Sequence, residues 1–108
     1  MEQTEFLEKN VFIDLKNSNE ESDKETVHYF SESDFETVLK RVEHFGISIY
    51  SIESRLKGKS FAVASHEDFK KKATDARWYK KGFSNLKNRQ SGLSYSATYK
   101  VSSKLLAR

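Results

Sequence analysis

The clearest hydrophobic pattern of the chain lies between residues 33 and 46. Ser33 and Glu36 have the spacing of a capping box at its start, and Gly46 stands where a left-handed C-cap belongs. Between them, apolar residues recur at the intervals of a helix with one buried face: Phe35, Val38, Leu39, Val42 and Phe45. The pattern predicts an amphipathic helix of about thirteen residues.

Period-two patterns follow this helix and predict strands. Residues 47–52 alternate isoleucine with polar residues, and residues 60–65 set Phe61 and Val63 among small side chains. The segment 56–59 between them contains glycine and has the length of a hairpin turn. The two strands are therefore expected to be antiparallel neighbours.

After residue 65 the period becomes helical again. Ser65 and Asp68 have capping spacing, and apolar residues continue at helical intervals as far as Leu86. Thr74 and Asp75 are expected to break this stretch into two helices.

Two further strands complete a recognisable order. Residues 26–30 form a short β-favouring run, and residues 93–101 alternate strictly between apolar and polar. The order predicts an α+β, ferredoxin-like βαββαβ fold, with two helices on one face of an antiparallel sheet. Residues 11–15 are expected to add an extra N-terminal strand, followed by an exposed acidic loop at 17–25.

Length and composition fit this picture. A chain of 108 residues predicts a single domain, with an N-terminal extension at 1–24 and the ferredoxin-like core at 25–102. Aromatic residues make up 13%, which suits a packed core. Cysteine is absent, no run approaches the roughly twenty apolar residues of a membrane span, and the first residues are acidic where a signal peptide would be basic. We expect a cytoplasmic protein that has no contact with a membrane.

The charges are divided along the chain. Residues 1–54 hold thirteen acidic and five basic side chains, whereas residues 55–108 hold three acidic and fourteen basic ones. Such a split creates local fields that the net charge of +3 conceals. If the acidic and basic helices lie side by side they will partly neutralise each other, so the usable positive surface is expected at 55–59 and on the outer side of 70–89.

Motifs for catalysis are missing from the sequence. The four glycines form no phosphate-binding loop, and the three histidines match no metal-binding spacing. His66, Glu67 and Asp68 would allow an acid/base pair, but acidic residues in a first helical turn also serve the helix dipole. We expect no enzymatic activity, no cofactor and no metal.

Basic and aromatic residues alternate between 69 and 89, which leaves two interpretations open. Such a mixture is typical of nucleic-acid binding, with cations for phosphates and rings for stacking. Alternatively, the rings form the core stripe of a helix and the cations its solvated face. Trp78 falls off that stripe and is expected to be an exposed anchor. The predicted partner-binding residues are Arg55, Lys57, Lys59, Arg77, Trp78, Lys80 and Lys81.

Residues 59–63 and 66–69 resemble the basic, aromatic strand and second helix of RNA-recognition modules, and residues 11–15 faintly resemble their first-strand motif. The sequence departs from that pattern because it lacks the usual glycine and last aromatic, and because it has an insertion at 16–25.

Residues 45–53 and 93–101 resemble the helix-glycine-strand junction and closing strand of small ferredoxin-like immunity proteins. Those proteins neutralise RNA-cleaving bacterial toxins of the colicin and contact-dependent-inhibition kind. The resemblance implies that the protein blocks the active site of a toxin nuclease without chemistry of its own.

Two function hypotheses follow. The first is a protein-binding inhibitor or immunity protein, in which charge selects the partner and speeds association. The second is a small nucleic-acid-binding domain that uses residues 55–89. Neither hypothesis fixes the oligomeric state.

Overall fold

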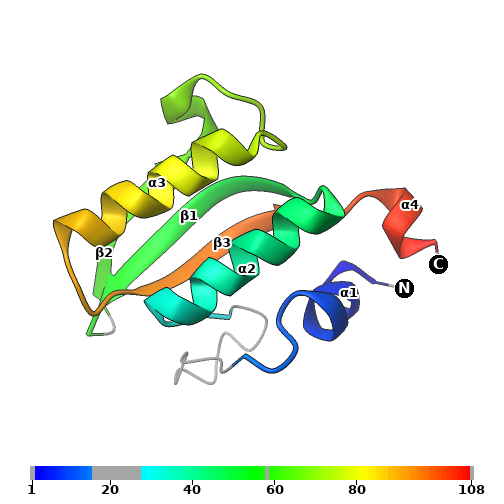
Figure 1. The fold of residues 1–108 in the computed structure, drawn as a ribbon, viewed down its shortest axis with the longest axis horizontal. Helices are drawn as coiled ribbons and strands as arrows, with labels where there is room; N and C mark the ends of the chain where they lie inside the picture. Colours follow the sequence, from blue (N-terminus) through cyan, green and yellow to red (C-terminus); the bar gives the residue numbers. More distant parts are fainter. Residues whose placement is uncertain (1, 16–27, 58, 108) are drawn as a thin grey trace.

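The computed structural model describes residues 2–15, 28–57 and 59–107. It confirms an α+β architecture, with helices packed on a three-stranded antiparallel sheet (Figure 1). The elements in chain order are α1 (Gln3–Asn10), α2 (Glu32–Phe45), β1 (Ser48–Leu56), β2 (Lys59–Ser65), the 3₁₀ helix η2 (His66–Phe69), α3 (Ala76–Arg89), β3 (Ser94–Lys100) and α4 (Ser103–Leu106).

The sheet has the order β2-β1-β3, and α2 and α3 lie side by side on one of its faces (Figure 1). The strand expected at 26–30 is described only from His28, and there it forms a single antiparallel bridge between Phe30 and Tyr95 on the outer side of β3. A ferredoxin-like sheet has the strand after the first helix at an edge, whereas β1 is central. The ferredoxin-like topology is therefore not confirmed.

The prediction of an N-terminal strand at 11–15 is wrong. The chain forms α1 and then turns, with the N–H groups of Val11 and Phe12 both donating to the carbonyl of Leu7. Arg41 of α2 donates to the carbonyls of Val11 and Ile13, at 2.9 and 2.7 Å, so these groups cannot pair with a strand. Val11 and Phe12 are consecutive and both buried in the turn that follows α1. The acidic loop predicted at 17–25 lies outside the described residues.

Helix α2 confirms the strongest pattern of the sequence. It buries Phe35, Val38, Leu39 and Val42 and ends at Gly46, whose φ of 69° is the expected left-handed C-cap. Its start differs from the prediction, because the hydroxyl of Ser31, and not that of Ser33, accepts the N–H of Asp34.

The predicted hairpin of β1 and β2 is confirmed, but β1 does not alternate regularly. Its pairing with β3 shifts between Ile49 and Ser51, so Tyr50 is the extra residue of a β-bulge. As a result Ile49 and Ile52 are both buried, although they are three residues apart, while Tyr50 is exposed. A second shift follows Ser54, whose buried hydroxyl bonds both the N–H and the carbonyl of Ala62.

Tyr95 of β3 joins the sheet to both helices. Its ring lies 5.5 Å from that of Phe35 in α2 and 4.9 Å from that of Phe83 in α3. The apolar side predicted for this strand is buried at Leu93, Tyr95 and Val101, but its polar side is not fully exposed, because Ser96 is buried as well. Aromatic contacts of this kind add to the area that they bury, and they fix α3 relative to the sheet.

Candidate basic binding surface

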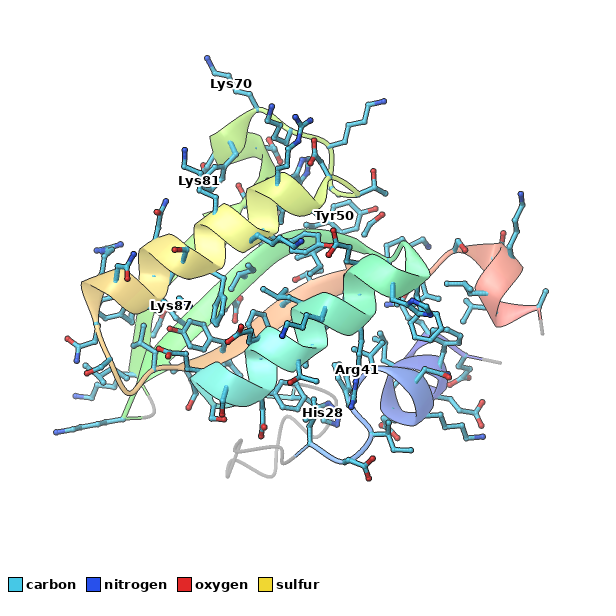
Figure 2. All side chains as sticks on the ribbon, in the orientation of Figure 1. His28, Arg41, Tyr50, Lys70, Lys81 and Lys87 are labelled. Carbon is cyan, nitrogen blue, oxygen red and sulfur yellow. The ribbon has the colours of Figure 1, made fainter. Side chains whose placement is uncertain are left out.

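The basic half of the chain is displayed at the two ends of α3. We call the cations near the η2–α3 loop the loop-end group: Lys70, Lys71, Lys72, Arg77 and Lys81. Those near the β1–β2 hairpin form the turn-end group: Arg55, Lys57, Lys59, Lys87 and Arg89. With 14 residues, α3 is about 20 Å long, and Figure 2 shows Lys87 toward its hairpin end, Lys81 about half-way along it, and Lys70 on the opposite side from Lys87. The structure thus separates cations that the sequence predicted as one surface.

The loop that carries the loop-end group is held by hydrogen bonds along its length. Lys70 adopts a left-handed conformation that ends η2, with a φ of 52°, and the N–H of Lys71 donates to the carbonyl of His66. The imidazole Nδ1 of His66 lies 2.8 Å from the carbonyl of Lys71. Further on, the carbonyl of Ala73 accepts the N–H of Ile49 from β1 at 3.0 Å. These bonds tie the loop to the sheet and fix the backbone from which its lysines extend.

The end of this loop is the N-cap of α3. The carboxylate of Asp75 accepts the N–H of Arg77 at 2.9 Å and also pairs with its guanidinium, at 2.7 Å. The hydrogen bond from the Arg77 side chain, followed by that from its backbone, lowers the pKa of Asp75 to about 2. The predicted break at Thr74 and Asp75 is confirmed, and the charge of Arg77 is partly neutralised.

Four lysines of the loop-end group are exposed and form no ion pair with the described residues: Lys70, Lys71, Lys72 and Lys81. Lys80, which the sequence also predicted as a binding residue, behaves differently. Its ammonium lies 2.8 Å from the carboxylate of Glu43, so it links α3 to α2. The expected neutralisation between the acidic and basic helices takes place at this position.

The prediction that Trp78 is an exposed anchor is wrong. Its side chain is 1% exposed, and its indole N–H donates to the carbonyl of Ala73 at 3.4 Å. The predicted stripe of Tyr79, Phe83 and Leu86 is buried as expected. The buried face of α3 is wider than that stripe, because η2 folds over the helix and brings the His66 ring to 6.3 Å from Trp78. Phe69, which would have begun the stripe of one continuous helix, instead lies in η2 with its ring 6.0 Å from Trp78.

The cations of the turn-end group are partly used for packing. The guanidinium of Arg55 lies 4.0 Å from the centre of the Tyr29 ring, and the Tyr29 hydroxyl donates to Glu53 at 3.0 Å. Burial and then the Glu53 carboxylate raise the pKa of Tyr29. Arg89 lies over the ring of Phe61 at 5.2 Å. Lys57 and Lys59, on either side of the turn, are exposed.

Sequence reasoning missed the aromatic contribution to the loop end. Tyr50 is 42% exposed, and its ring centre lies 5.9 Å from that of His66. The bulge in β1 turns Tyr50 toward solvent at this position. A bulge could not be predicted from the alternating run of isoleucine, serine and tyrosine. The exposed Tyr50 ring therefore contacts His66, whose imidazole is in turn bonded to the backbone of Lys71 in the loop.

Comparisons with known proteins add no identity: no family model matches the chain, and neither a curated protein nor a solved structure matches it. In the ranges that the structure describes, no helix has both the length and the apolar character that crossing a bilayer requires. Across the same ranges, histidine and acidic residues nowhere gather in threes around a potential metal position.

Proposed function

We propose that the protein is a non-enzymatic binding module that docks an acidic surface of another protein on its loop-end group. In this proposal Lys70, Lys71, Lys72 and Lys81 attract and orient the partner. Tyr50 and Arg77, residue types that often dominate binding energy, contribute the close contacts. The outcome for the partner is occlusion of a functional surface, as an inhibitor or immunity protein would achieve.

The observation that carries the proposal is the combination of lysines that have no ion-pair partner in the described ranges with a loop fixed by hydrogen bonds. Binding normally costs free energy because flexible loops and side chains must be ordered. Here the backbone of 70–75 is already tied to η2, β1 and α3. A loop that is rigid before binding favours specific docking over diffuse attraction.

Burial of the rings favours a protein partner over a nucleic acid. Single-stranded nucleic acids bind to positive grooves in which exposed aromatic rings stack on bases. The rings interleaved with the cations of α3 are in the core: Trp78, Tyr79 and Phe83. This leaves Tyr50 as the exposed ring among the described residues of the loop end, which is a poor platform for several bases.

The inhibitor or immunity role rests on the resemblance of residues 45–53 and 93–101. In this chain α2 ends at a left-handed Gly46 and leads directly into β1. Because the central place of β1 differs from a ferredoxin-like strand order, the proposed role rests on these local segments alone. A toxin nuclease that binds RNA would have a basic active site, so we expect the acidic contact to come from a neighbouring part of such a partner.

A capture experiment with matched baits tests the proposal. Tagged wild-type chain, a Lys70→Glu/Lys72→Glu variant and a Lys57→Glu/Lys59→Glu variant are incubated with lysate of the native host. The proposal predicts a protein recovered stoichiometrically by the wild type and the turn-end variant, and lost from the loop-end variant. Equal recovery by all three baits would contradict the assignment of the surface.

Direct titration with RNA and DNA tests the nucleic-acid alternative. Binding to phosphates through lysines would fall by orders of magnitude between about 50 and 200 mM salt. The protein-binding proposal predicts no detectable complex with short single strands or duplexes at the higher salt. Recovery of RNA alone in the capture experiment, together with a steep salt slope, would establish the alternative instead.

A further inference from the structure

A cleft of about 230 Å³ lies between α2 and α3, the two helices that cover the sheet. Leu39 of α2 and Phe83 of α3 are each 4% exposed and form its apolar floor. On the α3 side, Ser84 lies one helical turn from both Lys80 and Lys87, and its short side chain leaves room between theirs. The cleft therefore combines a hydrocarbon floor with a polar rim.

The rim of this cleft carries an excess of positive charge. Three lysines and one glutamate line it: Lys40, Lys80, Lys87 and Glu36. Lys80 is already neutralised by Glu43, at 2.8 Å. Glu36 lies 4.0 Å from Lys40, and both side chains are exposed, so solvent weakens this pair. Two lysines against one glutamate leave one positive charge unbalanced, which suits a ligand with a single negative charge.

Lys87 and Ser84 are the groups best placed to hold that negative charge. Lys87 forms no ion pair with the described residues, and its ammonium lies 5.2 Å from the centre of the Phe83 ring, above the apolar floor. The Ser84 hydroxyl, one turn earlier on the same side of α3, forms no hydrogen bond with the described part of the chain. An ammonium and a hydroxyl at this spacing can both donate to one carboxylate.

We infer that this cleft binds a small apolar carboxylate, with its hydrocarbon on Leu39 and Phe83 and its carboxylate on Ser84 and Lys87. The ligand is small because sites for drug-sized molecules measure roughly 300–1,000 Å³, more than this cleft offers. A phosphate monoester is less suitable, since it carries almost two negative charges. The inference does not depend on the proposed function, because the cleft is lined by none of the loop-end cations.

Titration of the full chain with 2-naphthoate, followed by NMR of the backbone amides, tests the site. This probe joins a flat hydrocarbon to one carboxylate, and we expect a Kd of about 1 mM or tighter. The neutral 2-naphthamide has the same shape and should bind at least about fivefold more weakly. Acetate lacks the hydrocarbon and should not bind detectably at the same concentrations. The amides of residues 39–40 and 83–87 should shift most.

Two pairs of variants locate the site on α3. Ser84→Leu fills the cleft and should abolish binding of 2-naphthoate, whereas Asn85→Leu adds the same side chain at an exposed position and should leave binding unchanged. Lys87→Gln should weaken 2-naphthoate at least about fivefold and leave 2-naphthamide unchanged. Lys81→Gln, on the side of α3 away from α2 (Figure 2), should change the Kd of either probe by less than about twofold. Circular dichroism checks that each variant is folded.

Three results would overturn the inference. The first is a wild-type chain that shows no binding of 2-naphthoate in the millimolar range. The second is binding that persists in a folded Ser84→Leu variant, because the probe would then lie elsewhere. The third is equal affinity for 2-naphthoate and 2-naphthamide, or an affinity for 2-naphthoate that Lys87→Gln does not change, because the cleft would then select hydrocarbon without the carboxylate.

Discussion

The two ends of α3 carry similar numbers of cations but use them differently. At the turn end, Arg55 and Arg89 lie over the rings of Tyr29 and Phe61, so their charges help to hold side chains together. At the loop end, the lysines of 70–72 extend from a backbone fixed by hydrogen bonds and have no acidic partner in the described ranges. A count of charges therefore does not locate a binding surface, because cations that already make internal contacts are less available to a partner.

The largest effect is expected from removing the side chain beneath the loop end. Trp78→Ala would leave a large cavity under η2 and lose the indole hydrogen bond to Ala73. The free energy of unfolding should fall by about 3–5 kcal/mol, as measured by urea denaturation. Lys81→Ala, on the exposed side of the same helix, is the control and should change it by less than about 0.5 kcal/mol. A similar small loss in Trp78→Ala would show that the loop end does not rest on this side chain.

A smaller loss is expected near the turn end from Ser54→Ala. The Ser54 hydroxyl satisfies both backbone groups of Ala62 at the bulge, and its removal leaves them buried and unpaired. We expect a loss of about 1–3 kcal/mol. Ser51→Ala is the matched control in the same strand, because its hydroxyl contacts Thr98 at the surface. Equal losses in the two variants would mean that the bulge is not held by this hydroxyl.

The comparison of the two ends predicts that removing one cation lowers the free energy of unfolding at the turn end but not at the loop end. Arg55→Ala removes a cation from the face of Tyr29 and should destabilise the protein by about 0.5–1 kcal/mol. Lys70→Ala removes a cation that has no such ring contact among the described residues, and it should leave the unfolding free energy within about 0.5 kcal/mol of the wild type. Thermal and denaturant unfolding of both variants would measure this. A larger loss in Lys70→Ala would reverse the distinction drawn between the ends.

The smallest effect concerns pH and the N-cap of α3. Because the folded-state pKa of Asp75 is lowered to about 2 from 3.8, the ionised carboxylate stabilises the fold above the unfolded value. This contribution disappears as the pH falls through the folded value. The difference in unfolding temperature between wild type and Asp75→Ala should be constant above pH 3.8 and shrink toward pH 2. Glu67→Gln, which leaves the cap of α3 intact, should show no such change, and a constant difference for Asp75→Ala down to pH 2 would exclude this role.

The hydrophobic periods and turn residues of the sequence correctly predicted α2, the β1–β2 hairpin and β3. Helix α2 has a regular apolar period and a C-terminal glycine, the hairpin has its glycine-containing turn, and β3 alternates. The strand order could not be predicted in this way, because pairing partners are chosen by packing between distant segments. The N-terminal helix was not predicted, because the apolar run at 11–15 was interpreted as a strand, while α1 has no side-chain N-cap and buries only Phe6 and Leu7.

The binding surface was predictable only in part. The sequence shows that residues 70–89 are basic, and it predicts the break at Asp75, but it does not show that η2 folds back over Trp78 of α3. For this reason Trp78 was placed outside and is in fact in the core. The ion pair of Lys80 with Glu43 depends on how α2 and α3 pack, and the exposure of Tyr50 depends on a β-bulge. Neither feature can be predicted from the local hydrophobic pattern.

The most direct test of the account is the affinity of the captured partner for two charge-reversal variants, measured by isothermal titration calorimetry. Lys70→Glu/Lys72→Glu and Lys57→Glu/Lys59→Glu change the net charge equally, so any difference between them reports the position of the charges. We predict a loss of at least about tenfold for the loop-end variant and a change within about twofold for the turn-end variant. Equal losses, or a loss confined to the turn-end variant, would contradict the assignment of binding to the loop end.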